Sequence, residues 1–391
     1  MQAAKAGLSP TTIFTLAICC GLSVATVYYN QAMLPLIGQS FGISAVHVGQ
    51  IAMLTQIGYA FGLLLFVPLG DRLQRKTLIL VMLAFNALSL VASALAPSFV
   101  LLLVASAALG LSAISAQIII PAATVLAAPA QRGQVLGMMV SGLSAGGLLA
   151  RALSGVVSTW LGWRGMYLLA AGLNLLLALA IFARMPTSVP SSQQRYLALM
   201  RSLWDLLRQY STLRWSALIG ALTFGALNVF WGAMASLLAQ PTYGYSSAQA
   251  GLFGLSAVFG ILCSAYLGRL TARHGMRLSY TGALVLLITY AGLYFAGELG
   301  WWWLILLVAS SIDLGNRANQ LASQTRALAL APEAVSRLNT VFMVAYFCGG
   351  ALGSMLGSAA AGHYGWQGLG LAGGSFALVA LLAIFAGRKV R

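Results

Sequence analysis

Residues 67–76, VPLGDRLQRK, place one acidic and three basic side chains between two long apolar segments, 47–69 and 77–96. Each apolar segment is close to the length of about 20 residues that an α-helix needs to cross a hydrocarbon core about 30 Å thick. We therefore interpret the decapeptide as a charged turn between two transmembrane helices.

Similar clusters of Lys and Arg recur about every 50 residues, and the sequence between them carries almost no charge. Each interval is long enough for two apolar helices of about 20 to 25 residues and a short turn. Six intervals therefore predict twelve transmembrane helices. The expected spans are 11–36, 47–69, 77–96, 99–127, 134–160, 166–185, 213–239, 248–269, 278–297, 301–327, 338–361 and 368–386.

The composition excludes a soluble globule, because the 391 residues are 60% hydrophobic and only 7% charged, whereas about 25% of the residues of a soluble domain are charged. A net charge of +16 would suggest nucleic acid in a soluble protein. Here, however, 18 of the 21 Lys and Arg fall in predicted loops and tails on one side, and Arg164 alone lies on the other. This bias follows the positive-inside rule. We expect a multi-pass protein of a bacterial inner membrane, with lipid as its partner, no nucleic acid and both termini cytoplasmic.

The two halves of the chain repeat. A shift of 203 residues pairs Gly146-Gly147 with Gly349-Gly350, and Gly162-Trp163 with Gly365-Trp366. Matched glycines and aromatic residues at one offset indicate two similar six-helix units, which is an architecture of transporters. We predict an N-terminal bundle over 1–185, a cytoplasmic linker with an amphipathic helix over 186–212, and a C-terminal bundle over 213–391.

Residues 67–76 also carry a family motif. The pattern Gly-x-Leu-x-Asp-Arg-x-Gly-Arg-Lys is matched except at Val67 and Gln74, and residues 268–277 hold a weaker copy in which Ala272 replaces the Asp. The chain thus resembles a major facilitator superfamily transporter of the drug- or sugar-efflux-like branch with twelve helices. The resemblance covers essentially the whole chain. It implies an all-α integral membrane fold of twelve transmembrane helices in two pseudo-symmetric six-helix bundles.

The same resemblance implies a gate at this turn. In the family, the corresponding Asp contacts the start of helix eleven and helps to hold the cytoplasmic gate closed, so the role passes to Asp71, with Arg72 and Arg75 as its partners. A solvated cluster that only fixes topology would explain the cations but not Asp71.

Two further family motifs are incomplete. Helix four of many proton-linked members carries Arg-x-x-x-Gly, and here Ser106 stands in the place of the Arg, with Gly110 retained. Helix five of the drug antiporters carries Gly-Pro-x-x-Gly-Gly, and residues 142–147 keep the glycines without the Pro. These glycines either allow close helix packing or keep a meaning specific to antiport.

Three ionisable residues other than histidine are expected to lie within the bilayer, away from the ends of the predicted spans, namely Arg151, Asp313 and Arg317. Each costs about 2.5 to 3.5 kcal/mol near a helix centre, so that a functional role is a reasonable default. Arg317 follows Asp313 by one turn on the same face and is placed for an intrahelical ion pair. That pair is either purely structural or the site of proton coupling, with Asp313 as the proton acceptor and Arg151 as a competing cation.

Polar side chains in the spans predict the lining of a central cavity, because helices one, four, seven and ten line it in the resembled fold. Gln117 and Gln320 are related by the 203-residue shift. The expected lining residues are Tyr28, Asn30, Gln31, Gln56, Tyr59, Gln117, Asn228, Trp231, Asn316 and Gln320.

These features predict a secondary active transporter rather than an enzyme. Two Arg against one Asp in the spans favour a small neutral or weakly anionic substrate. We expect proton-coupled efflux by alternating access, in a monomer and without cofactor or metal, because no phosphate-binding or metal-ligating motif is present. Two alternatives remain open. One is a proton-coupled importer of a sugar or organic acid, and the other is a non-transporting membrane receptor or assembly factor.

Overall fold

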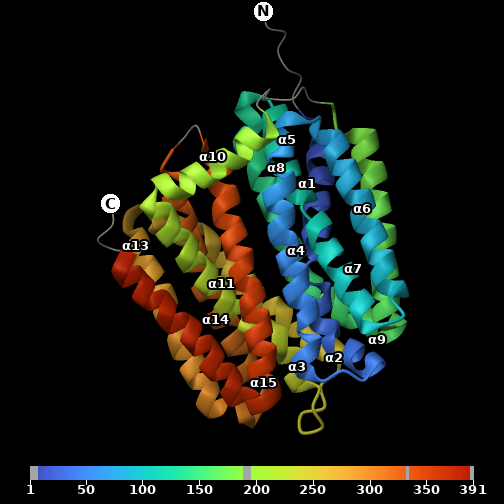
Figure 1. The fold of residues 1–391 in the computed structure, drawn as a ribbon, viewed down its shortest axis with the longest axis vertical. Helices are drawn as coiled ribbons and strands as arrows, with labels where there is room; N and C mark the ends of the chain where they lie inside the picture. The colour runs from blue at the N-terminus through green and yellow to red at the C-terminus, as the bar shows by residue number, and fades with distance from the viewer. Residues whose placement is uncertain (1–7, 188–194, 332–333, 388–391) are drawn as a thin grey trace, which may run out of the picture.

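The computed structural model describes residues 8–187, 195–331 and 334–387, and within them the chain is helical without strands. Twelve transmembrane helices form two six-helix bundles, which lie side by side in Figure 1. The expected amphipathic helix, α10, runs across one end of the molecule. The expected transmembrane fold is therefore confirmed.

The helices of the first half come first along the chain, and three transmembrane helices are each made of two elements. These are the pairs α1 and α2, α3 and α4, and α7 and α8. The elements are α1 (Pro10–Ala25), α2 (Tyr29–Phe41), α3 (Ala45–Val48), α4 (Gln50–Phe66), α5 (Leu69–Arg72), α6 (Arg75–Leu95), α7 (Phe99–Ser112), α8 (Ser115–Leu126), η1 (Pro129–Gln131) and α9 (Arg132–Arg184).

The second half follows α10 (Tyr196–Gln209). Its elements are α11 (Ser211–Leu238), α12 (Ser247–Leu252), η2 (Phe253–Ser256), α13 (Ala257–Ala296), η3 (Gly297–Leu299), α14 (Trp302–Leu328) and α15 (Val335–Gly387). The long helices α9, α13 and α15 each contain two transmembrane segments, because their backbone is non-helical at Gly162, His274 and Gly365.

Two of these turns show the internal repeat in atomic detail. Gly162 and Gly365 both adopt a positive φ, 68° and 56°, which a side chain would disfavour. The tryptophan that follows each glycine is buried, and its indole N–H donates a 2.9 Å hydrogen bond: Trp163 to the Ser40 hydroxyl, and Trp366 to the Tyr243 hydroxyl. The donors and the acceptors are both 203 residues apart, so the shift found in the sequence corresponds to equivalent contacts in the two bundles.

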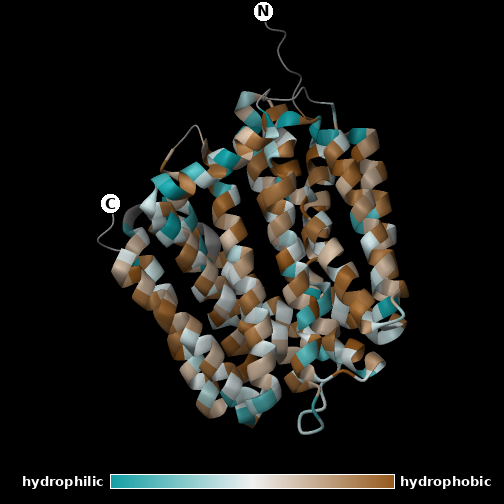
Figure 2. Cartoon of the chain, in the orientation of Figure 1, coloured by the Kyte–Doolittle hydropathy of each residue, from teal (hydrophilic) through white to brown (hydrophobic). Residues whose placement is uncertain are grey.

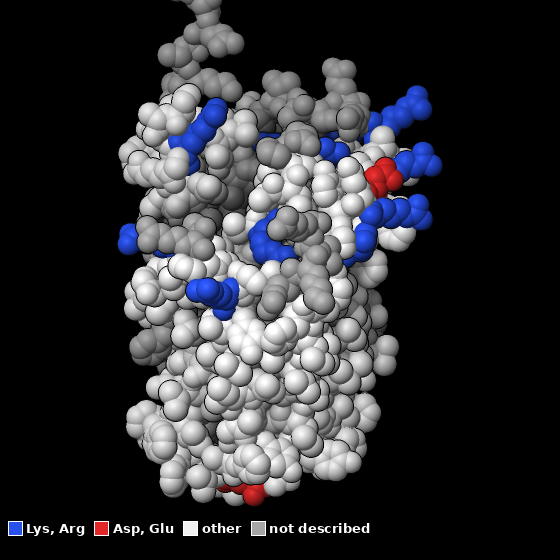
Figure 3. Space-filling model, turned by 90° about the vertical axis from the view of Figure 1, so that its left-hand side faces the viewer, with Lys and Arg blue, Asp and Glu red and all other residues white. Residues whose placement is uncertain are grey.

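The surface separates apolar flanks from charged ends. Figure 2 shows hydrophobic residues along the helices, and side chains such as Leu88 and Phe295 are largely exposed there. On the face drawn in Figure 3, Lys and Arg lie only in the upper part, toward the end that carries the chain termini. We call this the cationic end. An apolar flank of this extent fits a lipid environment.

One helix is less apolar than the rest. Eight segments of the described residues are long and apolar enough to cross a membrane, and those at 129–184 and 335–387 each hold two crossings. The remaining crossings are the segment from α12 to His274 and helix α14. Helix α14 has sufficient length but not sufficient hydropathy, because it carries Asp313, Arg317 and several amides.

Helix α10 has the expected amphipathic character. Leu199, Leu203 and Leu206 are buried against the bundles, whereas Arg201 is exposed. At its start, the Tyr196 hydroxyl donates to the Leu65 carbonyl of α4 at 3.0 Å. The helix therefore connects the linker to the N-terminal bundle at the cationic end.

The bundles contact each other closely at the opposite end, along two seams. In one seam, Gly251 of α12 packs on α9 so tightly that a Cβ would lie 2.5 Å from the Arg151 carbonyl oxygen. In the other, a Cβ on Gly49 would lie 2.0 Å from the Ser358 hydroxyl of α15. From these seams the two bundles diverge toward the cationic end (Figure 1).

Candidate functional site

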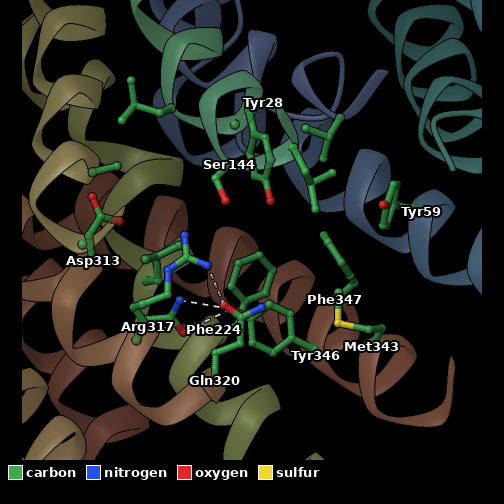
Figure 4. Close-up of a pocket in the computed structure, with 18 of the residues that line it drawn as sticks. Tyr28, Tyr59, Ser144, Phe224, Asp313, Arg317, Gln320, Met343, Tyr346 and Phe347 are labelled. Atoms are coloured by element: carbon green, nitrogen blue, oxygen red, sulfur yellow. Dashed lines mark hydrogen bonds between the residues drawn. The ribbon is translucent and has the colours of Figure 1, made fainter. Parts of the chain in front are cut away.

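A cavity of about 160 Å³ lies between the bundles and is lined by helices of both. Figure 4 shows it with Asp313 and Arg317 on one side and Tyr59 on the other. Its lining residues are Val24, Tyr28, Tyr59, Gln117, Leu143, Ser144, Gly147, Leu148, Arg151, Phe224, Leu227, Ala257, Gly260, Asp313, Asn316, Arg317, Gln320, Met343, Tyr346 and Phe347.

Asp313 and Arg317 of α14 both face this cavity, but they do not form the expected ion pair. Arg317 Nη1 instead donates to Gln320 Oε1 at 3.2 Å, toward the next turn of the helix. Asp313 is turned the other way and accepts from the Ser256 hydroxyl at 3.1 Å and from Trp231 Nε1 at 3.4 Å. Each side chain thus has a neutral partner of its own, which explains why the pair is not formed.

The third charge, Arg151, is held in place from three sides. Its Nε donates to Gln31 Oε1 at 2.6 Å, and its guanidinium carbon lies 5.0 Å from the Tyr28 ring centroid and 4.2 Å from that of Trp231. Only 6% of the residue is exposed. Cation–π contacts of this kind compensate a desolvated guanidinium. Trp231 therefore contacts both Arg151, through its ring, and Asp313, through its N–H.

A chain of amides extends from Arg151 across the interface between the bundles. Gln31 Nε2 donates to Asn228 Oδ1 at 3.3 Å, and Gln56 Nε2 donates to the same oxygen at 2.8 Å. Gln56 Nε2 also lies 3.0 Å from the Ser354 hydroxyl. Since these residues come from both halves, the network links the bundles through buried polar contacts.

Half of the ten predicted lining residues belong to this buried layer rather than to the cavity. Along each helix they lie further toward the seams than the residues that do line it. Asn30 bonds to the Thr55 hydroxyl at 3.1 Å instead of facing the space between the bundles. Asn30, Gln31, Gln56, Asn228 and Trp231 thus lie outside the cavity lining in this conformation, and a contact with substrate stays a prediction for them.

The other five predicted residues, Tyr28, Tyr59, Gln117, Asn316 and Gln320, do line the cavity. Gln117 Nε2 donates to the Tyr59 hydroxyl at 3.3 Å. Asn316 Nδ2 donates to the Tyr346 hydroxyl at 3.0 Å. Gln117 and Gln320, which the repeat relates, thus each bind a side chain of their own bundle, Tyr59 and Arg317 respectively.

An aromatic wall, which the sequence reasoning missed, faces these polar groups. Phe224 and Tyr346 are stacked with ring centroids 3.9 Å apart, and Tyr59 contacts Phe347 at 4.3 Å across the bundles. Phe224 and Phe347 meet edge to face at 5.2 Å. We call these four residues the aromatic wall.

The 203-residue shift is a signal that could have found part of this wall. Leu143 and Tyr346 are related by it, as are Ser144 and Phe347, and all four line the cavity. Gln117 and Gln320 were predicted to line the cavity because the shift relates them. The same shift would have predicted these two pairs, which lie on α9 and α15.

The predicted gate lies at α5, at the cationic end. Arg75 Nε donates to the Gly70 carbonyl at 3.0 Å, and Arg72 is exposed. The side chain of Asp71 lies outside the described residues. The role of Asp71, Arg72 and Arg75 in closing this end therefore stays a prediction.

The glycines of residues 142–147, in the first transmembrane segment of α9, have a packing role. A Cβ on Gly142 would lie 2.2 Å from the Ala17 carbonyl oxygen, and one on Gly146 would lie 2.0 Å from that of Gly21. Small residues allow α9 to approach α1 this closely. Close packing, one of the two meanings considered for this motif, therefore accounts for the retained glycines.

Comparisons with known proteins agree with this geometry. The family model described as Major Facilitator Superfamily matches residues 16–334. The chain is 36% identical to "Uncharacterized transporter YgaY" of Escherichia coli O157:H7 over 97% of this chain and 96% of the relative. It is 26% identical to the "Probable sugar efflux transporter" of Helicobacter pylori strain HPAG1, over 94% of this chain and 93% of that one. Among solved structures, a bacterial homologue of the human lysosomal transporter Spinster, inward-facing and occupied, matches with a TM-score of 0.77 at 16% identity, over 97% of both chains.

Proposed function

Since the chain belongs to the major facilitator superfamily and is a multi-pass membrane transporter, we propose that it moves a small neutral or weakly anionic molecule by proton-coupled alternating access. The proposed units are the bundles 1–185 and 213–391, which rock about the cavity, with 186–212 as the linker. We further propose a bacterial inner membrane as its location. The cationic end then faces the cytoplasm, as the positive-inside rule favours.

The observation that carries this proposal is Asp313 in the cavity. Among the described residues it is the one acidic side chain of the lining, and its carboxylate accepts hydrogen bonds from α11 and η2. Rocking of the bundles would change these contacts and the distance to Arg151. A carboxylate whose surroundings alternate in this way can take up a proton on one side and release it on the other.

Proton-coupled efflux is the first form of the proposal, in line with the printed name of the Helicobacter relatives. Symport is the second, and one observation favours it. An anion bound at Arg317 would lie one helical turn from Asp313, so that like-charge repulsion disfavours the anion unless Asp313 is protonated. Such a site binds proton and anion together.

We also propose that closure of the cationic end brings α5 against the start of α15. Asp71 would then contact helix eleven, with Arg72 and Arg75 as its partners. Rocking would separate the two seams at the opposite end and expose the cavity there.

The proposal is tested with purified protein in liposomes that carry an imposed pH gradient of either sign. The panel of labelled compounds includes sugars, organic acids and uncharged amphipathic molecules. We expect the flux of at least one compound to reverse its response when the gradient is reversed, and the sign of that response separates exchange from symport. Flux no faster than in empty liposomes, or insensitive to the gradient, would contradict the proposal.

A further inference from the structure

The aromatic wall is the first half of a more specific site. Phe224 and Tyr346 present nearly parallel rings, with an interplanar angle of 17°, and Tyr59 adds a ring from the other bundle. Aromatic pairs prefer offset stacking or edge-to-face contacts and contribute about 0.5 to 1.5 kcal/mol beyond the area they bury. A planar ring placed in the cavity could extend this set of contacts.

The second half is the guanidinium of Arg317. It has five N–H donors, and within the described residues one hydrogen bond, to Gln320, uses them. Arg151 differs, because the Tyr28 and Trp231 rings and Gln31 already occupy it. Arg151 is also almost fully buried, whereas Arg317 is only partly buried, so Arg317 is the cation that can offer its remaining donors to an occupant of the cavity. A carboxylate fits a guanidinium with two parallel hydrogen bonds.

Two hydroxyl groups complete the polar side. In Figure 4, the hydroxyls of Tyr28 and Ser144 both point into the cavity. Neither has a hydrogen-bond partner in the described part of the chain. Asp313 does not take this place, since its two oxygens accept from Trp231 and Ser256.

The volume of the cavity indicates what size of molecule fits within it in this conformation. The cavity measures about 160 Å³, and an apolar protein cavity of about 150 Å³ is known to hold benzene. One ring with one small polar substituent is therefore the right size for this conformation. A sugar of similar size would leave hydroxyls without partners on the side formed by rings, Met343 and Leu227, which costs binding energy.

Building on the proposed transport, we infer that the substrate is a monocyclic aromatic acid, whose ring packs on the aromatic wall and whose carboxylate binds Arg317. The carboxylate supplies charge-assisted hydrogen bonds, and the flat ring supplies shape. The remaining N–H groups of Arg317 and the hydroxyls of Tyr28 and Ser144 fix its orientation.

The test is a titration of the purified protein with four probes of matched size, namely benzoate, cyclohexanecarboxylate, benzamide and glucose. Benzoate should bind most tightly. Cyclohexanecarboxylate keeps the charge but not the flat ring, and we expect it to bind about 3- to 10-fold more weakly. Benzamide keeps the ring but not the charge, and we expect a loss of about 10-fold or more. Equal binding of the two carboxylates, or tighter binding of glucose, would overturn the inference.

Variants then assign each contact. Arg317→Gln should abolish the preference for benzoate over benzamide, and Arg317→Lys should restore part of it. Phe224→Leu should abolish the preference for the flat ring. Arg326→Gln, on the same helix but outside the cavity, is the matched control and should leave all four affinities unchanged.

The affinities of the four probes for the wild-type protein test the inference even if a variant fails to fold. The experiments also distinguish a failure of the inferred substrate class from a failure of the proposed function. Gradient-driven flux of a sugar without benzoate binding would overturn the aromatic acid and leave the transporter proposal standing. Benzoate binding without gradient-driven flux would do the opposite.

Discussion

The two transmembrane helices that occupy equivalent places in the repeat, α7–α8 and α14, contribute very different chemistry to one cavity. The 203-residue shift places Gly110 opposite Asp313, Ile114 opposite Arg317 and Gln117 opposite Gln320. In the first bundle, Gly110 is packed so closely on α4 that a Cβ would lie 1.9 Å from the Thr55 carbonyl oxygen, and Ile114 is fully buried. The repeat thus supplies the scaffold twice, but it supplies the ionisable groups of this helix pair once.

The first transmembrane segments of α9 and α15 differ in the same way. Arg151 corresponds to Ser354 under the shift, and each contacts a glutamine of the interfacial network. A charge in one bundle thus faces the seam where the other bundle has a small hydroxyl. The asymmetry explains how two similar halves can form one site rather than two.

The largest expected effect comes from breaking this second pair. Arg151→Met removes a charged hydrogen bond to Gln31 and the cation–π contacts with the Tyr28 and Trp231 rings, so we expect a loss of about 2 to 5 kcal/mol in stability. Ser354→Ala, at the repeat-related position, removes one neutral hydrogen bond and should cost about 1 kcal/mol. The melting temperatures of the two variants in detergent check this order. Equal losses would show that the charge has no special structural role.

A smaller effect is expected at the first pair. Gly110→Ala forces a methyl group against the α4 backbone and should destabilise the protein by about 1 to 3 kcal/mol through overpacking. At the equivalent position, Asp313→Asn keeps the size of the side chain and should change the melting temperature much less. A stable Gly110→Ala protein would contradict the packing role assigned to that glycine.

The smallest effects are expected at the glutamines. Gln117→Ala and Gln320→Ala each remove one hydrogen bond, worth about 0.5 to 1.5 kcal/mol. Loss of Gln320 frees another donor of Arg317, whereas loss of Gln117 frees the Tyr59 hydroxyl. Calorimetric titration with benzoate should therefore give a larger change in affinity for Gln320→Ala, and the same change in both variants would argue that the two bundles contact the ligand alike.

Much of the fold was predictable because charge and apolar length are direct consequences of the bilayer. The expected span 77–96 corresponds to α6 at Arg75–Leu95, and 213–239 corresponds to α11 at Ser211–Leu238. The breaks after Ala25 and Ser112 were not predicted. Both occur inside apolar sequence, where hydropathy carries no information about local backbone geometry.

The site was predictable only in part, for a related reason. Polar residues in a span are costly, so Asp313, Arg317 and Gln117 stood out against their apolar neighbours. Phe224 and Tyr346 did not, because aromatic residues are equally at home in a core or against lipid. The direction in which the side chains of Arg151 and Asn228 point depends on the rotation of each helix and on the helix that it packs against across the interface. A single sequence does not contain this information.

We propose that proton coupling resides at Asp313, in one bundle only. The most direct measurement compares, in the same liposomes, gradient-driven uptake and substrate counterflow without a gradient for the wild type and Asp313→Asn. We expect the variant to retain counterflow and to lose the gradient-driven component. Gradient-driven uptake at the wild-type rate in Asp313→Asn would contradict it.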